Sequence, residues 1–118
     1  YGDYHQYESY KGYHPEEFKR FNDIYFSLNR SKLLISGDRH LSEILKFGKD
    51  SYEITSSPIH STVYPGSIKP GQTQYRVFAM DDKLNYGLLS IDNSAANSFK
   101  IIFKDIDGKV RFKDVFSF

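Results

Sequence analysis

A carboxylate and an imidazole lie two residues apart in the segment Ser36-Gly37-Asp38-Arg39-His40. Both side chains would project from a tight loop that Gly37 allows the backbone to make. A carboxylate with a neutral imidazole suits zinc, iron or manganese better than calcium or magnesium, which prefer oxygen ligands. Two ligands are too few for a complete metal site. The spacing alone leaves two interpretations open: a metal-binding loop, or a turn in which Asp38 bonds its own backbone and His40 lies on the surface.

The loop follows a short apolar run in the segment Lys32–Ser36. A continuous apolar run of this length predicts a strand buried on both faces, as in a sheet covered by helices. Enzymes of the α/β class place their chemistry outside the carboxyl ends of such strands. The position of the loop therefore favours a functional site.

A helix is predicted upstream of this strand. Proline at a first helical position loses no hydrogen bond, and Glu16 and Glu17 complement the positive end, so the helix should begin at Pro15. It should end near Asn29. Its apolar stripe would consist of Phe18, Phe21, Tyr25 and Leu28. Before it, tyrosines recur at every third position from Tyr1 to Tyr13, a spacing that fits a helix poorly and predicts an ordered loop.

The second half of the chain is predicted to be rich in strands, because 17% of the residues are aromatic. Residues 41–47 are ambiguous between a helix and a strand, and 56–74, rich in Ser, Thr, Pro and Gly, should form a long surface loop that could cover a site. An Asp107-Gly108 turn should close a final hairpin. The expected strands are Tyr52–Thr55, Tyr75–Met80, Tyr86–Ile91, Phe99–Ile106 and Val110–Phe116.

Composition restricts the classes of function. The 118 residues favour one unit, 1–118, and 16 basic against 15 acidic residues argue against a nucleic-acid or anionic-membrane partner. Without cysteine, the chain has no disulfides or zinc–thiolate sites. Because it begins at Tyr1 rather than Met, we expect a piece of a longer protein or a processed form.

Several segments share their order and spacing with a known family. They are Glu8-Ser9-Tyr10-Lys11-Gly12-Tyr13, Pro15-Glu16-Glu17, Ser36-Gly37-Asp38-Arg39-His40, Glu43 and Tyr52-Glu53-Ile54-Thr55-Ser56-Ser57. Together they resemble the carboxyl-terminal part of PhoD-like (alkaline phosphatase D) metallophosphoesterases. Two positions depart from the family pattern: Tyr10 replaces Trp, and Pro58-Ile59-His60 replaces Gly-Leu-Thr-His, which weakens His60 as an equivalent.

The resemblance implies an α/β fold, the carboxyl-terminal half of an αββα sandwich in which one helix precedes a β-rich segment. It implies a phosphoester hydrolase with two metal ions, in which the metals polarise the phosphoryl oxygens; iron, zinc, manganese and calcium stay open. His40 is the expected metal ligand. Asp38 would ligate a metal or act as a catalytic or orienting group, and Arg39 would contact phosphate or pair with a structural carboxylate. For Glu8 and His5, structural roles are favoured.

The family takes most of its metal ligands from amino-terminal motifs, and Gly-Asp-x-x-Asp and Gly-Asn-His do not occur in this chain. Alone, the chain should be inactive and should need the amino-terminal half of the same protein as a partner. An extracytoplasmic location is expected, because family members are often exported. Two alternatives stay open: a β-rich binding module with a tyrosine surface and no catalysis, and a fragment whose uncovered apolar faces cause self-association.

Overall fold

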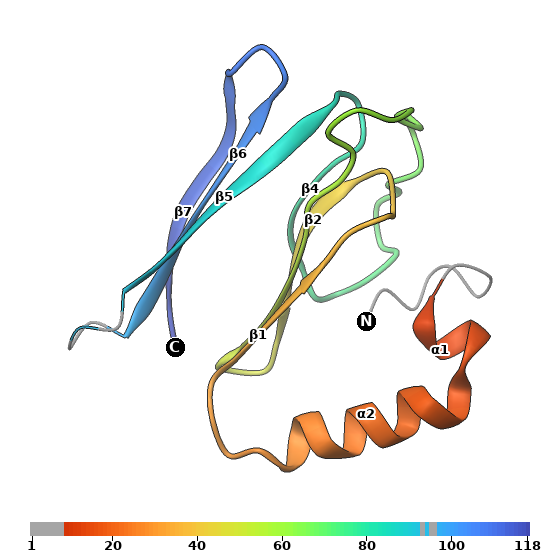
Figure 1. The fold of residues 1–118 in the computed structure, drawn as a ribbon, viewed down its shortest axis with the longest axis vertical. Coiled ribbons are helices and arrows are strands. Elements are labelled where there is room, and N and C mark those ends of the chain that lie inside the picture. Colours follow the sequence, from red (N-terminus) through yellow and green to blue (C-terminus); the bar gives the residue numbers. More distant parts are fainter. Residues whose placement is uncertain (1–8, 93, 95–96) are drawn as a thin grey trace.

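Two β-sheets pack face to face and form most of the fold (Figure 1). The computed structural model describes residues 9–92, 94 and 97–118, which form seven strands and two helices. The mixed sheet has the order β1-β3-β2-β4, from β1 (Lys32–Ser36), β3 (Ser51–Thr55), β2 (Ser42–Phe47) and β4 (Arg76–Met80). The antiparallel sheet consists of β5 (Asn85–Asp92), β6 (Ser98–Asp105) and β7 (Val110–Ser117). The predicted α/β class and β-rich second half are confirmed.

Aromatic side chains fill the space between the two sheets. Strand β6 alternates strictly, so that Phe99, Ile101 and Phe103 are buried and their neighbours are half-exposed. The ring of Phe99 lies 5.1 Å from that of Tyr52 on the mixed sheet, and the ring of Phe103 lies 5.3 Å from Phe78. The high aromatic content therefore forms the core between the sheets.

Strand β1 lies at the edge of the mixed sheet, and the predicted burial on both faces is wrong. Within the described residues β1 pairs with β3 alone, and Ile35 is 64% exposed. An apolar run predicts burial but says nothing of how many neighbours a strand has. Its exposed edge is a surface that another chain segment could cover.

Two helices lie on the side of the mixed sheet away from the antiparallel sheet, and most of α2 is exposed (Figure 1). Helix α2 (Pro15–Ser27) begins at Pro15 as predicted and ends two residues before Asn29. Tyr25 is its buried residue, and burial raises the pKa of this phenol while a hydrogen bond with Ser51 acts in the opposite direction. The predicted stripe fails at Leu28, which follows the helix and is 48% exposed.

The tyrosine-rich segment is partly helical rather than a loop. Helix α1 (Tyr10–Tyr13) begins after Ser9, whose hydroxyl accepts a hydrogen bond from the Gly12 N–H at 3.0 Å. This cap offsets the poor helical spacing of the tyrosines. Tyr1, Tyr4, Tyr7, His5 and Glu8 lie outside the described residues.

The remaining elements follow the predicted pattern closely. The ambiguous segment 41–47 contains strand β2, and residues 56–74 contain neither helix nor strand, as predicted; the next strand begins at Arg76, one residue later than expected. The final hairpin is confirmed, although residues 106–109 form a longer connection than a two-residue turn. Asp105 explains the difference, because its carboxylate accepts a hydrogen bond from the Lys109 N–H at 3.0 Å and supports the wider loop.

No helix among the described residues is long and apolar enough to cross a membrane.

Replacing Phe103 tests the packing between the sheets. The side chain is 0% exposed, and its ring lies 3.1 Å from the Cβ position that Gly87 leaves empty. We expect Phe103→Ala to lower the free energy of unfolding by about 3–5 kcal/mol, measured by urea denaturation. Val115→Ala on the exposed face of β7 is the control, with an expected change below about 1 kcal/mol. Equal effects of the two substitutions would contradict this packing.

Candidate functional site

The parallel pairing of β1 with β3 brings two loops to one edge of the mixed sheet. Ser36, the last residue of β1, is in register with Thr55, the last residue of β3. The next residue, Ser56, donates its backbone N–H to the Ser36 carbonyl at 3.2 Å. The loop that carries Asp38 and His40 therefore leaves the sheet beside the long loop 56–75, at the carboxyl end of a strand as predicted.

Left-handed backbone conformations shape the first loop. Asp38 has φ of 66° and His40 has φ of 54°, whereas Gly37 has no positive φ. The expectation that Gly37 makes the tight turn is therefore wrong, and the two candidate metal ligands make it themselves. Non-glycine residues adopt this region at a cost, and such residues gather at functional sites.

The imidazole of His40 is held by the long loop. Its Nδ1 hydrogen-bonds the backbone carbonyl of Thr62, and its ring lies 5.1 Å from that of Tyr64. Because a carbonyl can only accept, Nδ1 carries the proton in the neutral ring, and Nε2 carries a lone pair. Among the described residues, Nε2 has no hydrogen-bond partner. Histidines that bind metal ions have this arrangement, with one ring N–H fixed by a carbonyl and the other nitrogen available.

Asp38 and His40 lie between two hollows. The tyrosine hollow, about 510 Å³, is lined by both and by Tyr10, Tyr13, Tyr64 and Arg39, among others. The serine hollow, about 520 Å³, is lined by both and by residues that include Ser57, His60 and Asn85. Asp38 is exposed and forms no hydrogen bond or ion pair within the described part of the chain. Its carboxylate and the Nε2 of His40 are thus both available to a ligand.

Buried polar side chains support the strand ends beneath the loops. The Ser36 hydroxyl donates to the carboxylate of Glu53 at 3.1 Å and lies 2.8 Å from the Thr55 hydroxyl. On β2, Glu43 is 2% exposed and pairs with Arg76 at 3.2 Å. Buried charges need such partners, so these contacts rigidify the base of the site.

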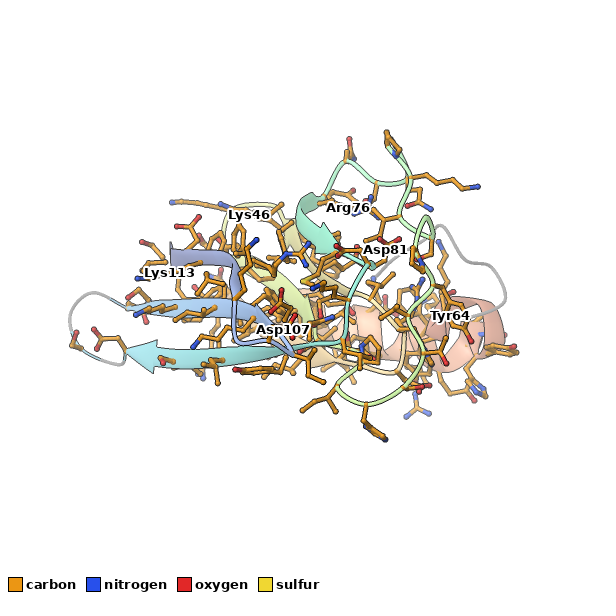
Figure 2. The ribbon with its side chains drawn as sticks, turned by 90° about the horizontal axis from the view of Figure 1, so that it is seen from above. Lys46, Tyr64, Arg76, Asp81, Asp107 and Lys113 are labelled. Atoms are coloured by element: carbon orange, nitrogen blue, oxygen red, sulfur yellow. The ribbon has the colours of Figure 1, made fainter. Side chains whose placement is uncertain are left out.

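The long loop is anchored along its length. Arg76 donates to the Lys69 carbonyl at 3.2 Å, and Asp81 accepts from the N–H of Ile68 at 2.9 Å. Figure 2 shows Arg76, Asp81 and Tyr64 on the same half of the molecule, away from Lys113 of β7. Residues 56–61 and Tyr64 of this loop line the two hollows, and the covering of a site by the loop stays a prediction.

The described residues alone do not complete a metal site. No group of three or more histidine, cysteine, aspartate or glutamate side chains among them is placed to hold a metal ion. A larger hollow of about 900 Å³ lies between α2 and the turn from β2 to β3, but among the residues that line it only Asp50 carries a carboxylate, and none is a histidine. We therefore place the candidate site at Asp38 and His40.

Comparisons with models of protein families, with curated proteins and with solved structures found no match. Function is therefore argued from the site itself.

Several residues at this site were not identified from sequence. The Thr62 carbonyl and Tyr64 are in an irregular loop, where no periodicity reveals a contact. Ser42 and Asn85 are buried polar residues, 0% and 2% exposed. A polar pair, Ser42-Glu43, inside the apolar run 41–47 was the available signal, because buried polar groups in a strand need specific partners.

The stabilities of two variants, Asp38→Gly and Asp38→Ala, test the left-handed backbone conformation at position 38. Both substitutions remove the carboxylate, but only glycine adopts positive φ without cost. The free energy of unfolding, measured by urea denaturation, should therefore be about 1 kcal/mol higher for Asp38→Gly than for Asp38→Ala. At Asp114 on β7 the same pair should show the opposite order, since glycine weakens a strand. A chain in which alanine is the better residue at position 38 would refute the left-handed conformation.

Proposed function

We propose that this chain is the carboxyl-terminal part of a metal-dependent phosphoester hydrolase of the PhoD-like type. The observation that carries the proposal is the state of His40: its Nδ1–H is held by the Thr62 carbonyl, and its Nε2 lone pair has no partner in the described part of the chain. The carboxylate of Asp38, beside it on the same two hollows, is also available. Neutral imidazole and carboxylate are the donors that zinc, iron and manganese take in hydrolases.

The three polar side chains of the loop would have different roles in the hydrolase. His40 Nε2 would bind a metal ion, and Asp38 would bind the same ion, bind a second one, or orient His40. Arg39 is half-buried at the wall of the tyrosine hollow, where its guanidinium can contact a phosphate or a structural carboxylate. When bound, the metals would supply charge stabilisation to the phosphoryl group. The hollows offer room for a phosphate ester beside the three side chains.

The missing ligands would come from the amino-terminal half of the same protein, which makes this chain inactive alone. The two packed sheets, with helices on the side of the mixed sheet away from the antiparallel sheet, support the proposal that the chain is half of an αββα sandwich. The exposed edge of β1, with Ile35, and the exposed Ile24 and Phe26 of α2 offer an apolar surface for that half. Without it, this surface would favour self-association of the chain.

A second candidate function rests on the tyrosines. Tyr10, Tyr13 and Tyr64 are 49%, 66% and 58% exposed and line one hollow together. Exposed tyrosines are enriched at interfaces, so this surface favours a binding module without catalysis. A binding module needs no metal at His40, whereas the hydrolase does, so metal binding at His40 distinguishes the two candidate functions.

Removing the imidazole of His40 tests the hydrolase. In the parent protein, expressed from its whole gene, we expect His40→Ala to lose bound metal and to lower hydrolysis of a chromogenic phosphate ester by at least about 100-fold. The measurements are elemental analysis of the purified protein and initial rates. Asp38→Asn, which keeps the size of the side chain, should lower one or both quantities.

Lys113→Ala is the control, because it removes an exposed side chain of β7 on the other half of the molecule from Tyr64 (Figure 2). It should leave metal content and rate close to those of the unaltered protein. Unchanged metal and activity in His40→Ala would refute the assignment. So would a natural gene product whose intact mass shows that it begins near Tyr1 and that works without a partner chain.

A further inference from the structure

A buried polar network joins the two sheets beside the candidate site. Ser42 lies on β2 of the mixed sheet and Asn85 begins β5 of the antiparallel sheet. The Ser42 hydroxyl donates to Oδ1 of Asn85, across the space between the sheets. With 0% and 2% exposure, neither side chain can exchange this partner for water.

The same two side chains hold the beginning of the long loop. The N–H of Ser57 donates to the Ser42 hydroxyl at 3.1 Å, and the carbonyl of Ser57 accepts from Nδ2 of Asn85 at 3.2 Å. The Asn85 backbone N–H donates to the carbonyl of Pro58 at 2.8 Å. Three bonds thus fix the backbone of residues 57–58 against both sheets.

Every hydrogen-bonding group of the Asn85 side chain is used. Its second amide N–H donates to the carbonyl of Lys83 at 3.0 Å, and its Oδ1 accepts from Ser42. A fully satisfied buried network specifies one arrangement, whereas loss of one member leaves unpaired polar groups at a cost of about 1–3 kcal/mol. The arrangement it specifies is the path by which the loop leaves β3.

That path determines where the Thr62 carbonyl lies. Only residues 59–61 separate the fixed pair 57–58 from Thr62, whose carbonyl holds Nδ1 of His40. Asn85 and His40 also line the same serine hollow. We propose that Asn85, together with Ser42, is a positioning residue: it fixes the loop that selects the Nδ1–H tautomer of His40 and so leaves Nε2 available to a ligand. The relevance of this role to catalysis rests on the proposed function, but the tautomer itself does not.

The tautomer of His40 is measured directly by nuclear magnetic resonance. The sample is the metal-free parent protein, labelled with ¹⁵N at histidine, at about pH 8, where free histidine is neutral. Long-range ¹H–¹⁵N correlation of the imidazole rings distinguishes a protonated from an unprotonated nitrogen. The unaltered chain should show His40 protonated at Nδ1 and bare at Nε2.

Loss of either network member should release the tautomer. In Asn85→Ala and in Ser42→Ala, the two ring nitrogens of His40 should move toward averaged shifts, because the Thr62 carbonyl is no longer held in place. Ser42→Ala removes a single hydroxyl, so it serves if Asn85→Ala does not fold, with near-ultraviolet circular dichroism as the check. Ser90→Ala, at an exposed serine of β5, is the control and should keep the unaltered pattern.

A folded Ser42→Ala chain that keeps Nδ1 fully protonated would overturn the positioning role. So would an unaltered chain in which His40 is protonated at Nε2. The result is separable from the proposed hydrolase function, because metal loss in the parent His40→Ala protein is measured independently. The tautomer measurement can support the positioning role even if the hydrolase proposal is refuted, and the metal measurement can support the hydrolase even if the positioning role is refuted.

Discussion

The in-register parallel pairing of β1 with β3 determines where every candidate site residue lies. Because Ser36 and Thr55 end their strands side by side, the loops that follow them must leave the sheet at the same edge. One loop contributes Asp38 and His40, and the other contributes the carbonyl of Thr62 that holds His40. A strand pairing of five residues thus brings the His40 side chain to a backbone carbonyl 22 positions away in the sequence.

Elements that begin or end at residues with strong local preferences, such as proline and glycine, were predicted correctly. Pro15 with Glu16 and Glu17 correctly marked the start of α2, and the segment around Gly108 correctly indicated the final hairpin. The failures were positions that depend on neighbours distant in the chain. The apolar run of β1 indicated burial, but its exposure depends on having one paired strand rather than two. The length of the hairpin connection is a local exception, because Asp105 supports the wider loop through a hydrogen bond with Lys109, four residues away.

The sequence indicated the two side chains on which the candidate site is centred, but not the contacts that hold them. Asp38 and His40 have the right types and spacing to be recognised, but their left-handed backbone was assigned to Gly37, because glycine is the usual residue for that conformation. The contacts that give the site its chemistry come from an irregular loop and from the start of β5. Asn85 is informative only once the fold brings it to Ser42. Sequence periodicity predicts helices and strands, but it does not predict contacts made by an irregular loop, so these contacts were not predicted.

The account depends on one atom, Nε2 of His40, as a metal ligand. The most direct test is X-ray diffraction from crystals of the metal-loaded parent protein, with data collected on both sides of the absorption edge of the metal. We expect an anomalous peak within about 2.0–2.2 Å of His40 Nε2, the distance of a metal–imidazole bond. Anomalous peaks elsewhere, with none at Nε2, would contradict the account.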